Sequence, residues 1–128
     1  MNQTRSRIIG TGAYIPPQVV TNEHFLTKTF VNADGSPMKY EMGKVIEKFG
    51  GVAGIKERRY AKDEYQAADL GTIAARKAIE SAGIDPETID YIILAHNFGD
   101  VPTVGGSADL LPNLAARIKH QLGIKNSF

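Results

Sequence analysis

The pattern of hydrophobic and polar positions divides the chain into helical and extended segments. Apolar residues at positions i, i+3, i+4 and i+7 predict a helix over about 39–49, because this spacing places them on one face. They are Met42, Val45, Ile46 and Phe49. Gly50-Gly51 is expected to end that helix, since glycine readily adopts the left-handed conformation past a helix end. Before it, Thr21 or Asn22 can cap a shorter helix that runs to about residue 29.

A longer helix is predicted from Asp63 to about Ala82. Asp63 and Gln66 resemble a capping box at its start, and Gly83 is expected to close it. One face of this helix carries mostly small residues, which allow a neighbouring backbone to lie close. They are Ala67, Leu70, Gly71, Ala74, Ala75 and Ala78.

A last helix is expected to begin at Pro112, where the missing N–H of proline costs nothing, and to end at Gly123. Its inner apolar stripe is formed by Leu114, Ala115, Ile118 and Leu122. One more helical turn is predicted at Asp85-Pro86.

Extended segments alternate with these helices. Ile89–Ala95 is an almost continuous apolar run, which is typical of a strand covered on both faces in a parallel sheet. Arg7–Tyr14 is predicted as a strand interrupted by Gly10 and Gly12, and glycine in a strand indicates that another backbone passes close to it. Gly54–Tyr60 is predicted as a short extended piece.

The order is therefore strand, helices, strand and helix, with a further strand that would open at Asn126–Phe128. Such alternation predicts an α/β fold in which helices flank a mixed, mostly parallel sheet with right-handed crossovers.

Composition excludes several functions for these 128 residues. The 15 basic and 14 acidic side chains give a net charge of +1, which argues against a dedicated nucleic-acid binder. There is no cysteine, and hence no disulfide framework, thiolate zinc site or thiol nucleophile within the sequence. No apolar run approaches the ~20 residues of a membrane span, and the first residues lack the apolar segment of a signal peptide. A cytoplasmic protein is expected.

Gly10-Thr11-Gly12 does not fit a phosphate-binding loop. A dinucleotide fingerprint needs glycine at the first, third and sixth positions directly before a helix. Here Ile15 takes the sixth position, and Pro16-Pro17 prevents a helix from starting. Arg58 and Arg59 could grip a phosphate, but we favour a structural ion pair.

Few other side chains suggest chemistry by position alone. His96 directly follows the predicted apolar strand, at the end where ligands bind in open α/β sheets. Asp63 and Glu64 could be paired carboxylates, but acids at a helix start account for them. His24 and His120 lack partners at metal-ligand spacing, so no metal site is expected.

Five segments, which together span nearly the whole chain, occur in an order and spacing found in one enzyme family. They are IIGTGAYIPPQVVTN, GIKERR, DLGTIAARKAIESAGI, IDYIILA and LPNLAARIKHQLGI. In this order and spacing the sequence resembles the β-ketoacyl-acyl-carrier-protein synthase III family of the thiolase superfamily. The opening segment and the helix that ends in AGI are specific in combination.

The resemblance implies a thiolase fold with two similar halves, of which residues 1–128 would form an incomplete N-terminal half. It implies a decarboxylative Claisen condensation, in which a cysteine takes the acyl group and malonyl-acyl-carrier protein supplies the carbanion. That cysteine would follow the strand opening near Phe128, and a histidine and an asparagine would come from the second half. The parent protein would be an acyltransferase of fatty-acid or lipid biosynthesis, whereas residues 1–128 alone would be inactive.

The resemblance also implies partners and site residues. The parent protein would act as a homodimer on acyl-CoA and acyl-carrier-protein thioesters, without a cofactor. His96 and Asn97 would lie near the wall of the active-site cavity, and Leu111 would stand beside the acyl pocket at the dimer interface. Where familiar members hold the adenine of coenzyme A with a tryptophan and an arginine, this sequence has Lys48 and Val52.

Two alternatives stay open. The chain could be a stand-alone, non-catalytic α/β module that binds a partner. It could also belong to another condensing enzyme of the superfamily, of the chalcone-synthase-like, hydroxymethylglutaryl-type or olefin-forming kind. Neither the acyl donor nor the pathway follows from the sequence.

Overall fold

The computed structural model describes residues 5–101 and 111–126. They divide into two compact units. The first, here called the hairpin unit, is Pro16–Lys62, and the second, the helix-pair unit, is formed by the described residues on either side of it.

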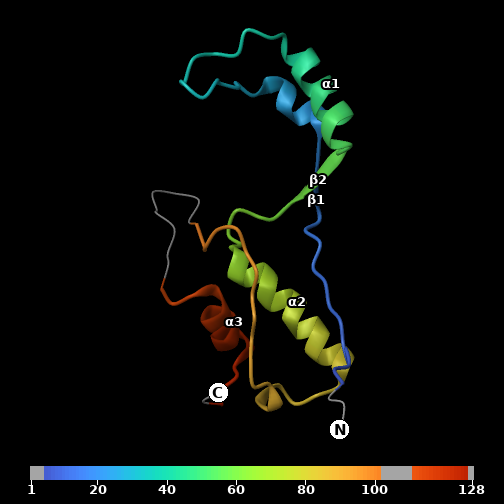
Figure 1. The fold of residues 1–128 in the computed structure, drawn as a ribbon, viewed down its shortest axis with the longest axis vertical. Helices are drawn as coiled ribbons and strands as arrows, with labels where there is room; N and C mark the ends of the chain where they lie inside the picture. The colour runs from blue at the N-terminus through green and yellow to red at the C-terminus, as the bar shows by residue number, and fades with distance from the viewer. Residues whose placement is uncertain (1–4, 102–110, 127–128) are drawn as a thin grey trace. The chain divides into compact units, whose positions relative to one another are not determined.

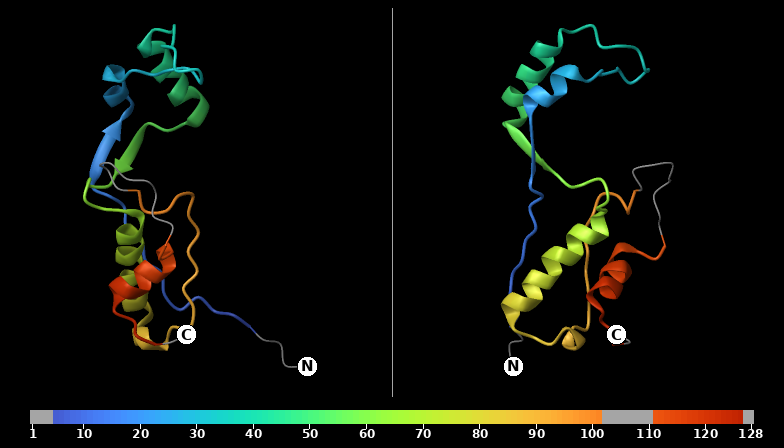
Figure 2. Two further views of the ribbon diagram at one scale, coloured as in Figure 1. Left: turned by 90° about the vertical axis from the view of Figure 1, so that its left-hand side faces the viewer. Right: turned by 180° about the vertical axis from the view of Figure 1, so that it is seen from behind.

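The hairpin unit is built on a two-stranded antiparallel ladder. Strand β1 (Gln18–Thr21) pairs with β2 (Glu57–Tyr60), so that Val20 stands opposite Arg58. Figure 2 shows the two arrows running in opposite directions, with the 3₁₀ helix η1 (Asn22–Thr27) and helix α1 (Met42–Ala53) between them in the chain. β2 confirms the second part of the extended piece predicted over Gly54–Tyr60, whose first residue instead caps α1.

Helix α1 confirms the predicted apolar stripe but not its predicted end. Val45 and Ile46 are buried, as the i, i+3, i+4 spacing requires. The helix runs through Gly50-Gly51 and ends only where Gly54 adopts a φ of 64° and donates its N–H to the carbonyl of Gly50. Glycine inside a helix costs only about 1 kcal/mol, so Gly50 and Gly51 can remain helical. The residue that adopts the left-handed conformation is Gly54, three residues after Gly51.

Side chains connect the short helix η1 to β2 and to the residues just before it. The Nδ2 of Asn22 donates to the carbonyl of Ile55 at 2.9 Å, and its Oδ1 accepts from Arg58 at 2.7 Å. Arg58 also lies over the ring of Phe25, 5.0 Å from its centroid. Arg59 pairs with Glu57 at 3.2 Å, which confirms the structural ion pair favoured over a phosphate grip for this residue.

The helix-pair unit contains α2 (Ala67–Ala82), the turn η2 (Pro86–Thr88) and α3 (Leu114–Leu122). In Figure 1, α2 and α3 lie side by side, and the extended segment 89–95 runs along them. Gly83 closes α2 and Gly123 closes α3, both with positive φ, as predicted. The turn predicted at Asp85-Pro86 is also confirmed.

The starts of both helices differ from the prediction. The capping box of α2 is formed by Gln66 and Asp69, whose Oδ2 accepts from the Gln66 N–H at 2.8 Å, and not by Asp63 and Gln66. Asp63 lies in a turn before the helix. Helix α3 begins after Asn113, whose Oδ1 accepts from an N–H of the first turn. The side chain of asparagine accepts a hydrogen bond from a free N–H of the first turn, whereas the side chain of Pro112 has no acceptor atom.

The small-residue face of α2 is in close contact on two sides, as predicted. A Cβ at Gly71 would lie 2.7 Å from Cδ1 of Ile118 in α3. A Cβ at Gly12 would lie 2.4 Å from the carbonyl oxygen of Ala74, and one at Gly10 would be equally crowded. The glycines therefore let the N-terminal segment lie directly on α2, which confirms the close approach.

The segments Arg7–Tyr14 and Ile89–Ala95 are extended but form no ladder among the described residues, so their prediction as strands is corrected. A strand requires a neighbour that pairs with its N–H and C=O groups, and an apolar pattern alone does not supply one. Leu94 packs against the core of Ala68, Leu114 and Ile118.

Only one face of segment 89–95 is covered by the described residues. Tyr91 is 84% exposed and Ile93 93% exposed, whereas the prediction had both faces buried. The strand predicted from Asn126 falls mostly outside the described residues. No helix in the described ranges is long and apolar enough to cross a membrane.

Candidate functional site

The three residues predicted from the family resemblance lie in irregular segments. His96 and Asn97 follow the extended segment 89–95, and both are exposed. The Nδ1 of His96 lies 2.7 Å from the carbonyl oxygen of Phe98. Because a carbonyl only accepts, the Nδ1 carries the proton in this hydrogen bond, which leaves Nε2 as the acceptor of the neutral ring. Leu111 is 82% exposed.

A buried carboxylate follows His96 and Asn97 in the chain. Asp100 is only 3% exposed, and its Oδ1 accepts from the N–H of Ala68 at 2.9 Å. That N–H belongs to the first turn of α2, where backbone donors have no partner within the helix and the helix dipole favours negative charge. The helix start therefore stabilises the Asp100 carboxylate.

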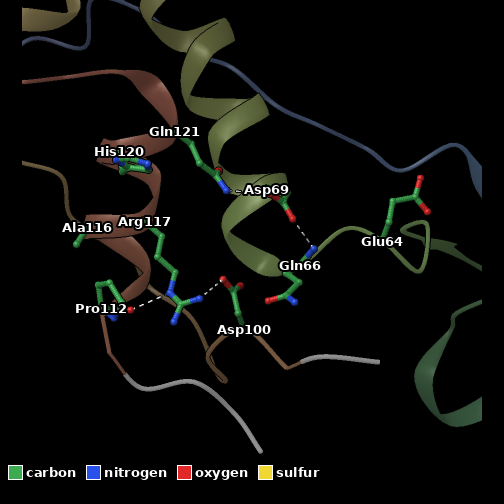
Figure 3. Close-up of a pocket in the computed structure, with 9 residues that line it drawn as sticks. All are labelled: Glu64, Gln66, Asp69, Asp100, Pro112, Ala116, Arg117, His120 and Gln121. Carbon is green, nitrogen blue, oxygen red and sulfur yellow. Dashed lines mark hydrogen bonds and ion pairs between the residues drawn. The ribbon is translucent and has the colours of Figure 1, made fainter. Parts of the chain in front are cut away.

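Arg117 supplies the second partner of Asp100 and joins two separate stretches of chain. Its guanidinium donates to Oδ2 of Asp100 at 3.4 Å, to the carbonyl of Pro112 at 2.8 Å and to the carbonyl of Leu111 at 3.3 Å. Figure 3 shows the Arg117 side chain between Pro112 and Asp100. The chain before residues 102–110 is thus tied to the chain after them.

A second set of polar contacts extends this arrangement along the two helices. Nε2 of Gln121 donates to Oδ1 of Asp69 at 2.9 Å, so the capping carboxylate of α2 also binds α3. The buried hydroxyl of Thr72 contacts the carbonyl of Ala68 at 2.8 Å and the side chain of Gln121. These contacts fix the register of α3 on α2.

Together these side chains surround an open, polar pocket of about 340 Å³. Its lining residues are Glu64, Gln66, Asp69, Asp100, Pro112, Ala116, Arg117, His120 and Gln121. Within the described ranges, no group of acidic, histidine or cysteine side chains could hold a metal ion. Asp100 binds Arg117 and Asp69 binds Gln121, so these side chains form a structural frame rather than a set of free reactive groups.

The structure brings only one predicted residue to this frame. Leu111 contacts it through its carbonyl oxygen, whereas His96 and Asn97 do not line the pocket. Asp100 and Arg117 were missed by sequence reasoning. Two features of the sequence could have pointed to them. Asp100 is a single acidic residue in a glycine-containing loop, and Arg117 stands next to the apolar stripe of the last helix.

Comparisons with known proteins agree on one family. No family model matches the sequence. The chain is 35% identical over 123 residues to the acetoacetyl CoA synthase NphT7 of Streptomyces sp. (strain CL190), an alignment that covers 96% of this chain and 31% of that protein.

Solved structures give the same result. The 3-oxoacyl-acyl-carrier-protein synthase III from Aquifex aeolicus VF5 superposes with a TM-score of 0.66 at 34% identity, over 94% of this chain and 32% of that one. The priming β-ketosynthase from the R1128 polyketide biosynthetic pathway superposes with a TM-score of 0.56 at 27% identity, over 91% of this chain and 29% of that one.

The α/β elements and these superpositions define a protein of the thiolase fold, as predicted. The chain spans about a third of the length of the relatives it matches. Within that fold, the chain belongs to the β-ketoacyl-acyl-carrier-protein synthase III family, which confirms the resemblance seen in the sequence motifs.

Proposed function

We propose that residues 1–128 form the N-terminal part of a condensing enzyme that joins an acyl thioester to a malonyl thioester. The observation that carries this proposal is the alignment of 96% of the chain with a protein named acetoacetyl CoA synthase, at 35% identity. A solved 3-oxoacyl-acyl-carrier-protein synthase III supports it at nearly the same identity.

The proposed reaction has two steps. A thiolate attacks the acyl thioester and releases the thiol of its carrier, and a malonyl thioester then loses carbon dioxide to give a carbanion equivalent. This carbanion attacks the enzyme-bound acyl carbonyl, which forms the carbon–carbon bond and regenerates the thiolate. Residues 1–128 contain no cysteine, so the thiolate would come from sequence outside them.

Within this proposal the described residues act as a scaffold for the substrate cavity. Arg117 fixes the carbonyls of Leu111 and Pro112, so it would position the residue proposed to stand beside the acyl chain. His96 and Asn97 would contribute to the wall of the cavity. Acyl-CoA and an acyl carrier protein are the proposed substrate carriers, and a homodimer is the proposed assembly.

The proposal also accounts for an exposed apolar face. Tyr91 and Ile93 are large side chains on a segment whose other face packs on α2 and α3. In a complete thiolase-fold enzyme this segment would be a strand of the central sheet, with Tyr91 and Ile93 covered by the layer on its other side. Hydrogen exchange on the full-length protein would then show protected amides at residues 89–95.

The decisive experiment is an acyl-transfer assay of the full-length protein. A panel of acyl-CoA donors is combined with malonyl-CoA or malonyl-acyl-carrier protein, and 3-oxoacyl products and carbon dioxide are measured by mass spectrometry. We expect products with at least one donor, and none from residues 1–128 alone. A folded full-length protein that forms no product, and takes no acyl group from any donor, would favour the non-catalytic interaction module instead.

A further inference from the structure

Residues 32–37 form a tight turn in the loop between η1 and α1 of the hairpin unit (Figure 1). The N–H of Asn32 donates to the carbonyl of Ser36 at 2.8 Å, and the N–H of Gly35 donates to the carbonyl of Asn32 at 2.9 Å. Gly35 adopts a φ of 80°, in the left-handed region that favours glycine. Each residue of the turn is exposed, so water reaches all of it.

The pair Asp34–Gly35 in this turn has a reactivity of its own. The backbone nitrogen of the residue after an aspartate can attack the side-chain carboxyl carbon and close a five-membered imide, and a side chain on that residue hinders the attack. Glycine has none, and no described atom beyond its chain neighbours lies within 4 Å of where a Cβ at Gly35 would stand. Asp34 is the only aspartate in the sequence that precedes glycine, and no asparagine does.

The reaction needs no reagent other than water. The Gly35 nitrogen forms a bond to Cγ of the protonated Asp34 side chain, and its proton leaves with the carboxyl OH as water. Water then opens the imide at one of its two carbonyl carbons. Cleavage of the new bond to Cγ restores aspartate, whereas cleavage of the main-chain bond leaves isoaspartate, whose backbone is one methylene longer.

The turn holds the Asp34 carboxylate in contacts that oppose ring closure. Its Oδ1 accepts from the N–H of Ser36 at 2.9 Å and from the Ser36 hydroxyl at 2.6 Å. That hydroxyl accepts from Nδ2 of Asn32 at 2.9 Å, which leaves its own proton for Asp34. The hydroxyl and the N–H of Ser36 lower the pKa of Asp34, whereas ring closure uses the protonated carboxyl.

We propose that Asp34–Gly35 is a site of spontaneous isoaspartate formation, and that Ser36 slows this reaction in the folded protein. The added methylene would shift Gly35 and Ser36 relative to Asn32, so the hydrogen bonds that close the turn would be lost once isoaspartate forms. The inference depends on this turn alone, and its failure would leave the proposed condensation untouched.

Ageing of the purified protein at constant pH and temperature tests the site. Peptide mapping by mass spectrometry locates the product, and a protein isoaspartate methyltransferase with labelled S-adenosylmethionine measures its amount. We expect isoaspartate at Asp34, and far less at Asp63, Asp69 and Asp90, which precede larger residues. An unmodified Asp34, or equal modification at the other aspartates, would overturn the assignment.

Two serine variants and an unfolded sample test the protection. Ser36→Ala should raise the rate at Asp34 severalfold, toward the rate of the parent protein unfolded in urea. Ser81→Ala removes the hydroxyl of an exposed serine in α2 and should alter the rate less than twofold. Equal rates in the parent and Ser36→Ala, or in the native and the unfolded parent, would show that Ser36 and the turn give no protection. The comparison of native with unfolded parent holds even if Ser36→Ala does not fold.

Discussion

Substitution of Gly12 by alanine tests the close approach of the N-terminal segment to α2. The added Cβ would lie 2.4 Å from both the carbonyl oxygen of Ala74 and the amide nitrogen of Ala78, which are backbone atoms of α2 and cannot rotate away. Ordinary contacts lie near 3.5 Å, so the N-terminal segment would have to withdraw by more than about 1 Å. Overpacking of this kind costs about 1–3 kcal/mol.

The expected result is a fall in Tm measured by circular dichroism. At about 4 °C per kcal/mol for a chain of this length, the Gly12→Ala variant should melt roughly 4–12 °C below the parent. Gly43→Ala is the control, because Gly43 lies in α1 with no atom within 4 Å of the added Cβ. It should leave stability unchanged or raise it by up to about 1 kcal/mol. If Gly12→Ala melts with the parent, the segment does not lie directly on α2.

Three other substitutions test single contacts. Asp100→Ala removes the buried carboxylate that binds α2 and Arg117, and urea denaturation should show a loss of about 2–3 kcal/mol; an unchanged midpoint would contradict its structural role. Asp69→Ala breaks the capping box and should cost about 1 kcal/mol in the same assay, with equal stability as the refuting result. Hydrogen bonds from Ser36 lower the pKa of Asp34 below its usual 3.8, so this carboxylate stabilises the turn above that pH and loses its contribution as the pH falls. Ser36→Ala removes the hydroxyl donor and keeps the backbone N–H, so it should raise the Asp34 pKa part of the way to its usual value in an NMR titration, and an unmoved pKa would exclude the Ser36 hydroxyl as a cause.

Several features set by local sequence were predicted correctly. The apolar stripe of α1, the small-residue face of α2 and the glycine ends at Gly83 and Gly123 each depend on spacing within one helix. Gly10 and Gly12 also indicated that another backbone passes close to the N-terminal segment, because glycine in an extended segment often leaves room for such a neighbour. Such signals need no knowledge of which element is the neighbour.

Features that depend on a partner far along the chain were not predicted. Segments 7–14 and 89–95 have strand-like sequences, but a ladder depends on a second segment at the right distance. Asp100 and Arg117 are 17 residues apart and meet only because α2 and α3 pack together. Asp69, and not Asp63, serves the cap, and it also receives a hydrogen bond from Gln121 of α3.

The side chains around the pocket beside Arg117 are hydrogen-bonded and ion-paired to one another. Arg117 binds Asp100 and Gln121 binds Asp69, so the contribution of this frame to a condensing enzyme would be the placement of neighbouring segments. Charged groups that are already paired hold a structure together. Substitutions in this frame should therefore alter stability first.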